Sequence, residues 1–245
     1  MTIERSGPKI GVLVPYTNCN LEPDMMALCP PGCTMHFARM GGYDINKIPG
    51  SSQMAGLGAS DITEPLQLLS GVRPTVVLYG CTSATLTHGT AFDRDLAAKI
   101  RPETNAISLT AAGALVEGIK AIGATKVGFA SPYIGEVNDQ AVSFLADEDI
   151  SVTRMADIGQ DLGNYGQGEL TPDDVFQLSL LADHPDAQAI VLSCTDMRSV
   201  EAIERIEAAV GKPVITSNQA MVFALMKALG IPRHKNLPGR LFSHL

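Results

Sequence analysis

The sequence lacks features that several broad classes of protein require. It has no run of Lys or Arg, and its 18 basic and 26 acidic residues give a formal net charge of −8. Nowhere do 18 apolar residues stand together, and the charged N-terminus is followed by only a short apolar run. We therefore expect no nucleic-acid binding, no membrane span and no signal peptide.

The cysteines also lack the patterns of disulfide and zinc proteins. They are five in number, with no CxxC pair and no histidine at zinc-finger spacing: Cys19, Cys29, Cys33, Cys81 and Cys194. This disfavours a disulfide framework and a structural zinc site, and it fits a reducing cytoplasm. Cys29 and Cys33 lie in a proline-rich loop, so we interpret them as structural or incidental.

Several catalytic and phosphate-binding motifs are missing as well. No GxSxG elbow is present, and the glycine-rich segment 159–168 has neither the strand-then-GxGxxG order nor a Walker lysine. We interpret that segment as a flexible loop. The five histidines are scattered without metal-ligand spacing, so we expect no metal centre.

Short β-branched runs alternate with longer amphipathic stretches along the 245 residues, of which 45% are hydrophobic. The predicted strands are Ile10–Val14, Pro74–Tyr79, Lys126–Ala130, Ala189–Ser193 and Pro213–Ile215. Helical spacing is visible over 111–122 and 200–210, and each stretch is followed by a glycine that suits a C-cap, Gly123 and Gly211. Continuous apolar strands flanked by helices predict the α/β class with parallel sheets.

An internal repeat divides the chain. Residues 9–16 match 126–133 at Lys, Gly, Pro and Tyr, and the strand-then-Cys-Thr pattern of 76–82 recurs in 190–195 at a nearly equal offset. We predict two similar α/β lobes related by pseudo-twofold symmetry, with the ligand site in the cleft between them. The first lobe takes residues 1–115 and 215–245, and the second takes residues 116–214.

The repeat makes Cys81 and Cys194 the candidate catalytic residues. Each follows a predicted strand and precedes a threonine, where a helix N-terminus would lower the pKa of the thiol. The alternative is that each is a small buried hydrophobic residue. With both in one cleft, the chemical interpretation is favoured.

Other polar residues fall at the same strand ends. Asn18 could bind a carboxylate or form an ordinary Asx turn, and Tyr133 could offer its hydroxyl to the cleft or pack as a core aromatic. Thr82, Ser83 and Thr195 supply hydroxyl and N–H groups, which would also suit helix caps.

The residue order Val-Pro-x-x-Asn, Gly-Cys-Thr-Ser, Pro-Tyr and Leu-Ser-Cys resembles the aspartate/glutamate racemase superfamily. It is more closely similar to the branch that contains maleate cis–trans isomerases and arylmalonate decarboxylases, from Gly11 to Phe242. The resemblance implies a cofactor-free enzyme of two Rossmann-like lobes, with a cysteine from each lobe beside a small carboxylate substrate. Cys81 and Cys194 match the two catalytic cysteines, and the decarboxylases keep only the second.

The resemblance also implies substrate contacts for Asn18 and Tyr133. The isomerases have Asp-Asn-Leu in the second-lobe loop, whereas this chain has Gln-Asp-Leu at 160–162, with Asn164 as a shifted substitute. Either Asp161 or Asn164 faces the substrate, and an acid in that place would disfavour maleate itself.

These observations predict a cofactor-independent isomerase or racemase that acts on a small carboxylic acid through Cys81 and Cys194. An arylmalonate-type decarboxylase with Cys194 as proton donor is the alternative enzyme, and a two-lobed ligand sensor is the non-enzymatic one. The sequence leaves open whether the chain forms a homo-oligomer.

Overall fold

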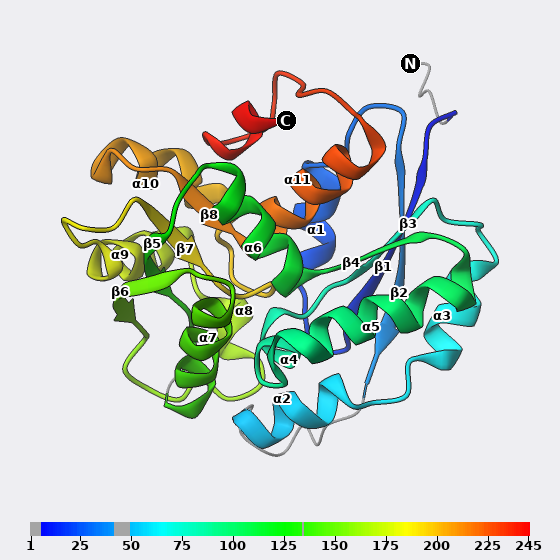
Figure 1. Cartoon of the computed structure of the whole chain (residues 1–245), viewed down its shortest axis with the longest axis horizontal. Helices are drawn as coiled ribbons and strands as arrows, with labels where there is room; N and C mark the ends of the chain where they lie inside the picture. Colours follow the sequence, from blue (N-terminus) through cyan, green and yellow to red (C-terminus); the bar gives the residue numbers. More distant parts are fainter. Residues whose placement is uncertain (1–5, 42–49, 134) are drawn as a thin grey trace.

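A computed structural model describes residues 6–41, 50–133 and 135–245, and it contains two parallel β-sheets covered by helices (Figure 1). The first sheet, in the order β2-β1-β3-β4, is built from β1 (Lys9–Pro15), β2 (Thr34–Met40), β3 (Val76–Tyr79) and β4 (Ile107–Thr110). The second, in the order β6-β5-β7-β8, is built from β5 (Lys126–Ala130), β6 (Ser151–Ala156), β7 (Ala189–Leu192) and β8 (Val214–Thr216). All paired strands are parallel. The repeated order confirms the predicted α/β class and its parallel sheets.

Helices connect the successive strands within each sheet, α6 connects the two sheets, and α11 follows the last strand. They are α1 (Leu21–Ala27), α2 (Ser51–Gly58), α3 (Thr63–Ser70), α4 (Thr82–Leu86), α5 (Gly89–Thr104), α6 (Ala111–Ala121), α7 (Glu136–Asp147), α8 (Gly166–Glu169), α9 (Pro172–Ala182), α10 (Ile203–Val210) and α11 (Ser217–Leu229), with 3-10 turns η1 (Val200–Ala202) and η2 (Leu241–His244). The stretch predicted over 200–210 is divided into η1 and α10. Gly211 ends α10 in the left-handed conformation, with φ of 73°, as a C-cap glycine does.

The strands that the sequence predicted are mostly the central ones. Five of the seven residues of β1 are apolar, and all but the first of its residues are buried, because helices cover both faces of a parallel sheet. The strands missed are β2, β4 and β6, which lie at sheet edges. Their polar and half-buried residues break the continuous apolar pattern.

Two helices lie between the sheets. α6 follows β4 and α11 follows β8, each capped by the last threonine of its strand, Thr110 and Thr216. Leu115 of α6 and Phe223 of α11 belong to one buried cluster that also includes Ile10 of the first sheet and Phe129 of the second. A shared apolar core therefore holds the two sheets together. The lobe boundaries given above remain a prediction, and the one between 214 and 215 falls inside β8.

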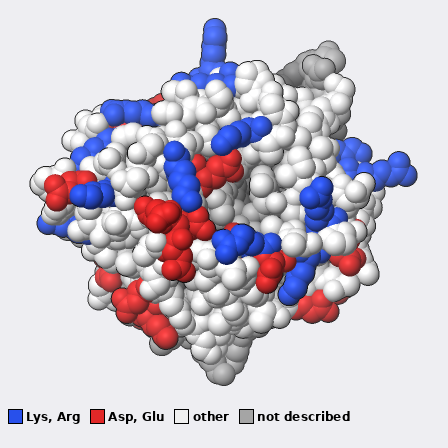
Figure 2. All heavy atoms as spheres, in the orientation of Figure 1, with Lys and Arg blue, Asp and Glu red and all other residues white. Residues whose placement is uncertain are grey.

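The carboxyl ends of β1, β3, β5 and β7 meet between the two sheets, with α2 beside them (Figure 1). On the face shown in Figure 2, acidic and basic side chains are intermixed and form no continuous basic stripe. Within the described ranges, no helix has both the length and the apolar character needed to cross a membrane.

Candidate active site

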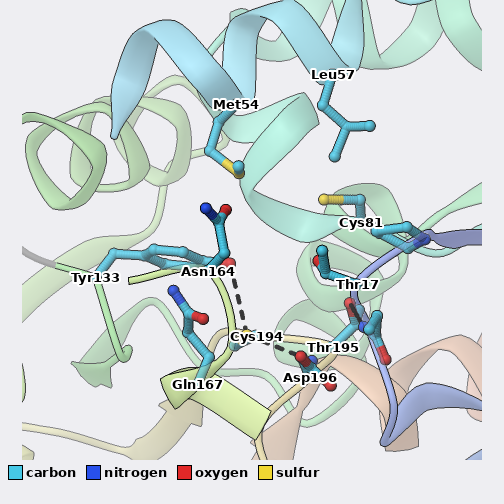
Figure 3. Close-up of a pocket in the computed structure, with 12 residues that line it drawn as sticks. Thr17, Met54, Leu57, Cys81, Tyr133, Asn164, Gln167, Cys194, Thr195 and Asp196 are labelled. Atoms are coloured by element: carbon cyan, nitrogen blue, oxygen red, sulfur yellow. Dashed lines mark hydrogen bonds between the residues drawn. The ribbon is translucent and has the colours of Figure 1, made fainter. Parts of the chain in front are cut away.

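A pocket at these strand ends brings together residues from both halves of the chain (Figure 3). Its lining is Pro15, Thr17, Asn18, Met54, Leu57, Cys81, Tyr133, Asn164, Gln167, Cys194, Thr195 and Asp196. Six of the eight predicted site residues are among them. The other two, Thr82 and Ser83, lie in the first turn of α4, directly after Cys81. None of these lining residues, all from the described ranges, is Lys or Arg, so the donors that they offer a substrate carboxylate are neutral.

Cys81 is the N-cap residue of α4 and is 5% exposed. Burial raises the pKa of its thiol, while the N–H groups of Ala84 and Ser83 and the Ser83 hydroxyl, 3.6 Å from the sulfur, act in the opposite direction. The Asp196 carboxylate also raises this pKa, by less than the Ala84 N–H group or the Ser83 hydroxyl lowers it. Gly80 allows the strand end to approach β1, because a Cβ atom there would lie 2.6 Å from the carbonyl oxygen of Leu13. The donors of the α4 N-terminus thus favour the thiolate of Cys81 over that of an equally buried cysteine without them.

Cys194 follows β7 and is 2% exposed. Burial and the nearby carboxylate of Asp196 raise the pKa of its thiol to about 12. Hydrogen bonds with Tyr133 and with the N–H group of Asp196, whose nitrogen lies 3.4 Å from the sulfur, lower the pKa by less. The chain does not enter a helix directly after Cys194, since η1 begins only at Val200. The prediction that a helix N-terminus lowers the pKa of both thiols is therefore wrong for Cys194, which has no adjacent helix. At Cys81 the helix N-terminus does act to lower the pKa, but burial outweighs it.

Hydroxyl groups connect the two thiols. Ser83 Oγ donates to Tyr133 Oη at 3.2 Å, and Tyr133 Oη lies 3.6 Å from the sulfur of Cys194. Because Ser83 Oγ also lies 3.6 Å from the sulfur of Cys81, four polar groups form a continuous chain. Burial raises the pKa of Tyr133 well above its usual value, so this residue keeps its proton. Cys81 and Cys194 are both free thiols.

Other predicted site residues are engaged in holding the loops. Asn18 Oδ1 accepts from the N–H groups of Asn20 and Leu21, which is the Asx turn that was the alternative interpretation. Asn18 Nδ2 donates to Thr195 Oγ1, at 3.0 Å, and Thr195 Oγ1 donates to the carbonyl oxygen of Gly80, at 2.9 Å. These side chains join the two cysteine loops as well as lining the pocket.

The second-lobe loop places Asn164 in the pocket lining, whereas Asp161 is exposed and accepts from the N–H group of Gly163. The objection that an acid raises to maleate therefore does not apply to Asp161 and passes to the acid that lines the pocket. A different acid, Asp196, lines the pocket, and its Oδ1 accepts from the N–H groups of Cys19 and Asn20.

Sequence reasoning missed Asp196, Gln167, and the apolar pair Met54 and Leu57 of α2. Asp196 carried a usable signal, since it lies two residues after a candidate cysteine at a strand end. The α2 pair carried none, because apolar residues in a helix look like core. Among the described residues, no three His, Cys, Asp or Glu side chains are grouped to hold a metal ion.

Comparison with known proteins places this site in a family. The model of the arylmalonate decarboxylase family matches residues 10–242. The chain belongs to this family.

Members of the arylmalonate decarboxylase family and its relatives resemble this chain over nearly its whole length. A maleate isomerase from Geobacillus stearothermophilus is 24% identical, covering 96% of this chain and 97% of the relative. An arylmalonate decarboxylase from Bordetella bronchiseptica is 28% identical, covering 98% and 96%. A cysteine-to-alanine variant of the maleate isomerase Iso from Pseudomonas putida S16, solved with maleate, has a TM-score of 0.88 at 27% identity, covering 97% and 98%. The resemblance found in the sequence is thereby confirmed, and so is the fold.

Proposed function

We propose that this member of the family is a cofactor-independent cis–trans isomerase of a small unsaturated carboxylic acid of the maleate type. Cys81 is the nucleophile and Cys194 is the proton donor. The observation that carries the proposal is that two free thiols line one pocket in unlike environments. The maleate isomerases among the relatives support the reaction class.

The unlike environments assign the two roles. The thiolate of Cys81 adds to one alkene carbon while Cys194 gives its proton to the other, which leaves a single bond about which the substrate rotates. The Cys194 thiolate then takes the proton back, the bond between carbon and the Cys81 sulfur breaks, and the double bond reforms in the trans arrangement. Donors at the α4 N-terminus favour the thiolate at Cys81, and the Asp196 carboxylate keeps the proton on Cys194.

Racemisation would use the same two residues differently. It requires each thiol to remove the α-proton in one direction and return it in the other, so the two thiols should be closely matched in acidity. The adjacent carboxylate at Cys194 and the helical donors at Cys81 instead favour fixed, unequal roles.

Decarboxylation of a malonate-type acid is the second candidate. It is supported by the relative from Bordetella bronchiseptica and by the apolar pair Met54 and Leu57, which would suit a hydrophobic substituent. In that reaction loss of CO2 is followed by protonation from Cys194, and Cys81 has no necessary role.

Proton NMR in D2O separates these reactions with one panel of maleate, aspartate, glutamate and an arylmalonate. We expect maleate to be converted to fumarate. Exchange of the α-proton of an amino acid would indicate a racemase instead, and loss of CO2 from the arylmalonate would indicate a decarboxylase.

A further inference from the structure

The first two residues of α11 contact both cysteine loops. Ser217 and Asn218 are 0% exposed. Ser217 Oγ accepts a hydrogen bond of 2.8 Å from Thr82 Oγ1, and Asn218 Nδ2 donates one of 3.0 Å to the carbonyl oxygen of Thr195. Thr82 directly follows Cys81 and Thr195 directly follows Cys194. One buried helix terminus therefore contacts the residue after each thiol.

Two hydrogen bonds that the Asn218 amide donates fix its orientation. Nδ2 also donates to Asp24 Oδ2 of α1 at 2.7 Å, so one NH2 group serves a carboxylate and a peptide carbonyl, which are both acceptors. Among the described residues, nothing donates to Asn218 Oδ1, although that atom is buried. An unsatisfied buried carbonyl costs about 1–3 kcal/mol. The two donated hydrogen bonds, rather than packing, are therefore the reason for an amide at this position.

Thr195 links Asn218 to the Cys81 loop on the other side of the pocket. Its hydroxyl donates to the carbonyl oxygen of Gly80, the residue before Cys81. A displacement of the Thr195 carbonyl would thus move the Cys194 loop relative to the Cys81 loop. Ser217 and Asn218 themselves are not among the residues that line the pocket.

We propose that Ser217 and Asn218 are positioning residues that set the placement of the two thiols across the pocket, Ser217 for Cys81 and Asn218 for Cys194. The inference rests on the proposed function, in which both thiols act on one bound substrate. Displacing a reacting group by about 1 Å costs on the order of a hundredfold in rate, so these buried contacts influence turnover without touching substrate.

An exchange of side chains separates positioning from folding. In the double variant Asp24→Asn/Asn218→Asp, the new amide on α1 can donate to the new carboxylate on α11, which restores the bond between these helices. In that variant the Thr195 carbonyl loses the hydrogen bond that Asn218 donates. We expect the unfolding midpoint to recover relative to Asn218→Asp alone, while kcat stays about a hundredfold below wild type with KM little changed. Recovery of kcat together with stability would overturn the proposal.

Alkylation of the native protein by iodoacetamide, followed by peptide mass spectrometry, tests the same point without a substrate. Ser217→Ala should raise the alkylation rate of Cys81 more than that of Cys194, and the double variant should do the reverse. Ser179→Ala is the matched control, because it removes a fully buried hydroxyl that donates within α9, and it should change neither rate. Equal changes at both cysteines, or none, would contradict the assignment. Failure of the wild-type protein to isomerise any substrate would count against the proposed function alone.

Discussion

Ser83 Oγ and Tyr133 Oη lie 3.2 Å apart, although one residue follows a strand of the first sheet and the other a strand of the second. This contact completes the chain of polar groups between the two thiols. It also places the Tyr133 hydroxyl beside Cys194, the group that we propose as the proton donor.

Replacing Tyr133 by phenylalanine removes the hydroxyl and keeps the ring. We expect kcat to fall about a hundredfold, since proton transfer by a positioned side chain typically contributes about 10²- to 10⁴-fold and the Tyr133 hydroxyl positions Cys194. Thermal unfolding should change little. Tyr165→Phe, at a tyrosine that is 55% exposed, is the control and should be active. Wild-type turnover in Tyr133→Phe would show that the hydroxyl chain has no part in the reaction.

Asp196→Asn should lower the pKa of Cys194 from about 12, because the variant loses the negative charge that helps to keep the thiol protonated. The rate of Cys194 alkylation, followed against pH by peptide mass spectrometry, should therefore rise at a lower pH than in the wild type. Asp161→Asn is the matched control at an exposed carboxylate outside the pocket. An unchanged alkylation profile in Asp196→Asn would mean that burial alone sets the pKa of this thiol.

Much of the fold was predictable because central parallel strands are buried on both faces. The apolar run of β1 could be read directly, whereas β2 at the edge reads Thr-Met-His-Phe-Ala-Arg-Met and has no such run. The repeat of strand, Cys and Thr located both thiols, since strand ends in α/β folds meet at one edge.

The parts of the site that were not predicted depend on tertiary contacts. Asn218 lies 23 residues from Thr195, with which it bonds, and 194 residues from Asp24. No local pattern marks such a partnership. The pKa values of the two thiols were misjudged for the same reason, because the extent of burial is a property of the assembled fold.

Buried Asp24 makes stability depend on pH. Desolvation raises the pKa of its carboxyl from 3.8 to about 6, although the hydrogen bond from Asn218 acts to lower it. The charges of Glu201 and Asp196 also act to raise this pKa, and the charge of Arg198 acts to lower it. The folded state thus binds the proton more tightly than the unfolded state, so this group's contribution to stability is greatest below pH 3.8 and is lost as pH rises through about 6.

Asp24→Asn keeps an acceptor for Asn218 and removes the titration. We expect the free energy of unfolding of the wild type, relative to this variant, to fall by about 1–2 kcal/mol between about pH 5 and about pH 7.5. Urea unfolding of both proteins at the two pH values measures this change in the free energy of unfolding. A difference independent of pH would show that Asp24 has the same pKa in the folded and unfolded states.

Cys29 and Cys33 lie outside the pocket lining, and the sulfur of Cys29 is 3.6 Å from the carbonyl oxygen of Cys33. Cys29→Ser and Cys33→Ser should therefore leave turnover unchanged, in contrast to Cys81→Ala and Cys194→Ala, which should each lose several orders of magnitude. Steady-state assays of the four variants make the comparison. A large loss of turnover in either serine variant would show that this loop takes part in the reaction although it does not line the pocket.

The central claim is that Cys81 forms the covalent bond and Cys194 moves the proton, and trapping the intermediate tests it most directly. Cys194→Ala and Cys81→Ala are each mixed with maleate, quenched in acid and digested for peptide mass spectrometry. We predict that Cys194→Ala carries an adduct with the mass of one maleate molecule on the peptide that contains Cys81, its second carbon protonated by water in place of Cys194, and that Cys81→Ala carries none. An adduct on Cys194, or near-normal turnover by Cys81→Ala, would contradict the account.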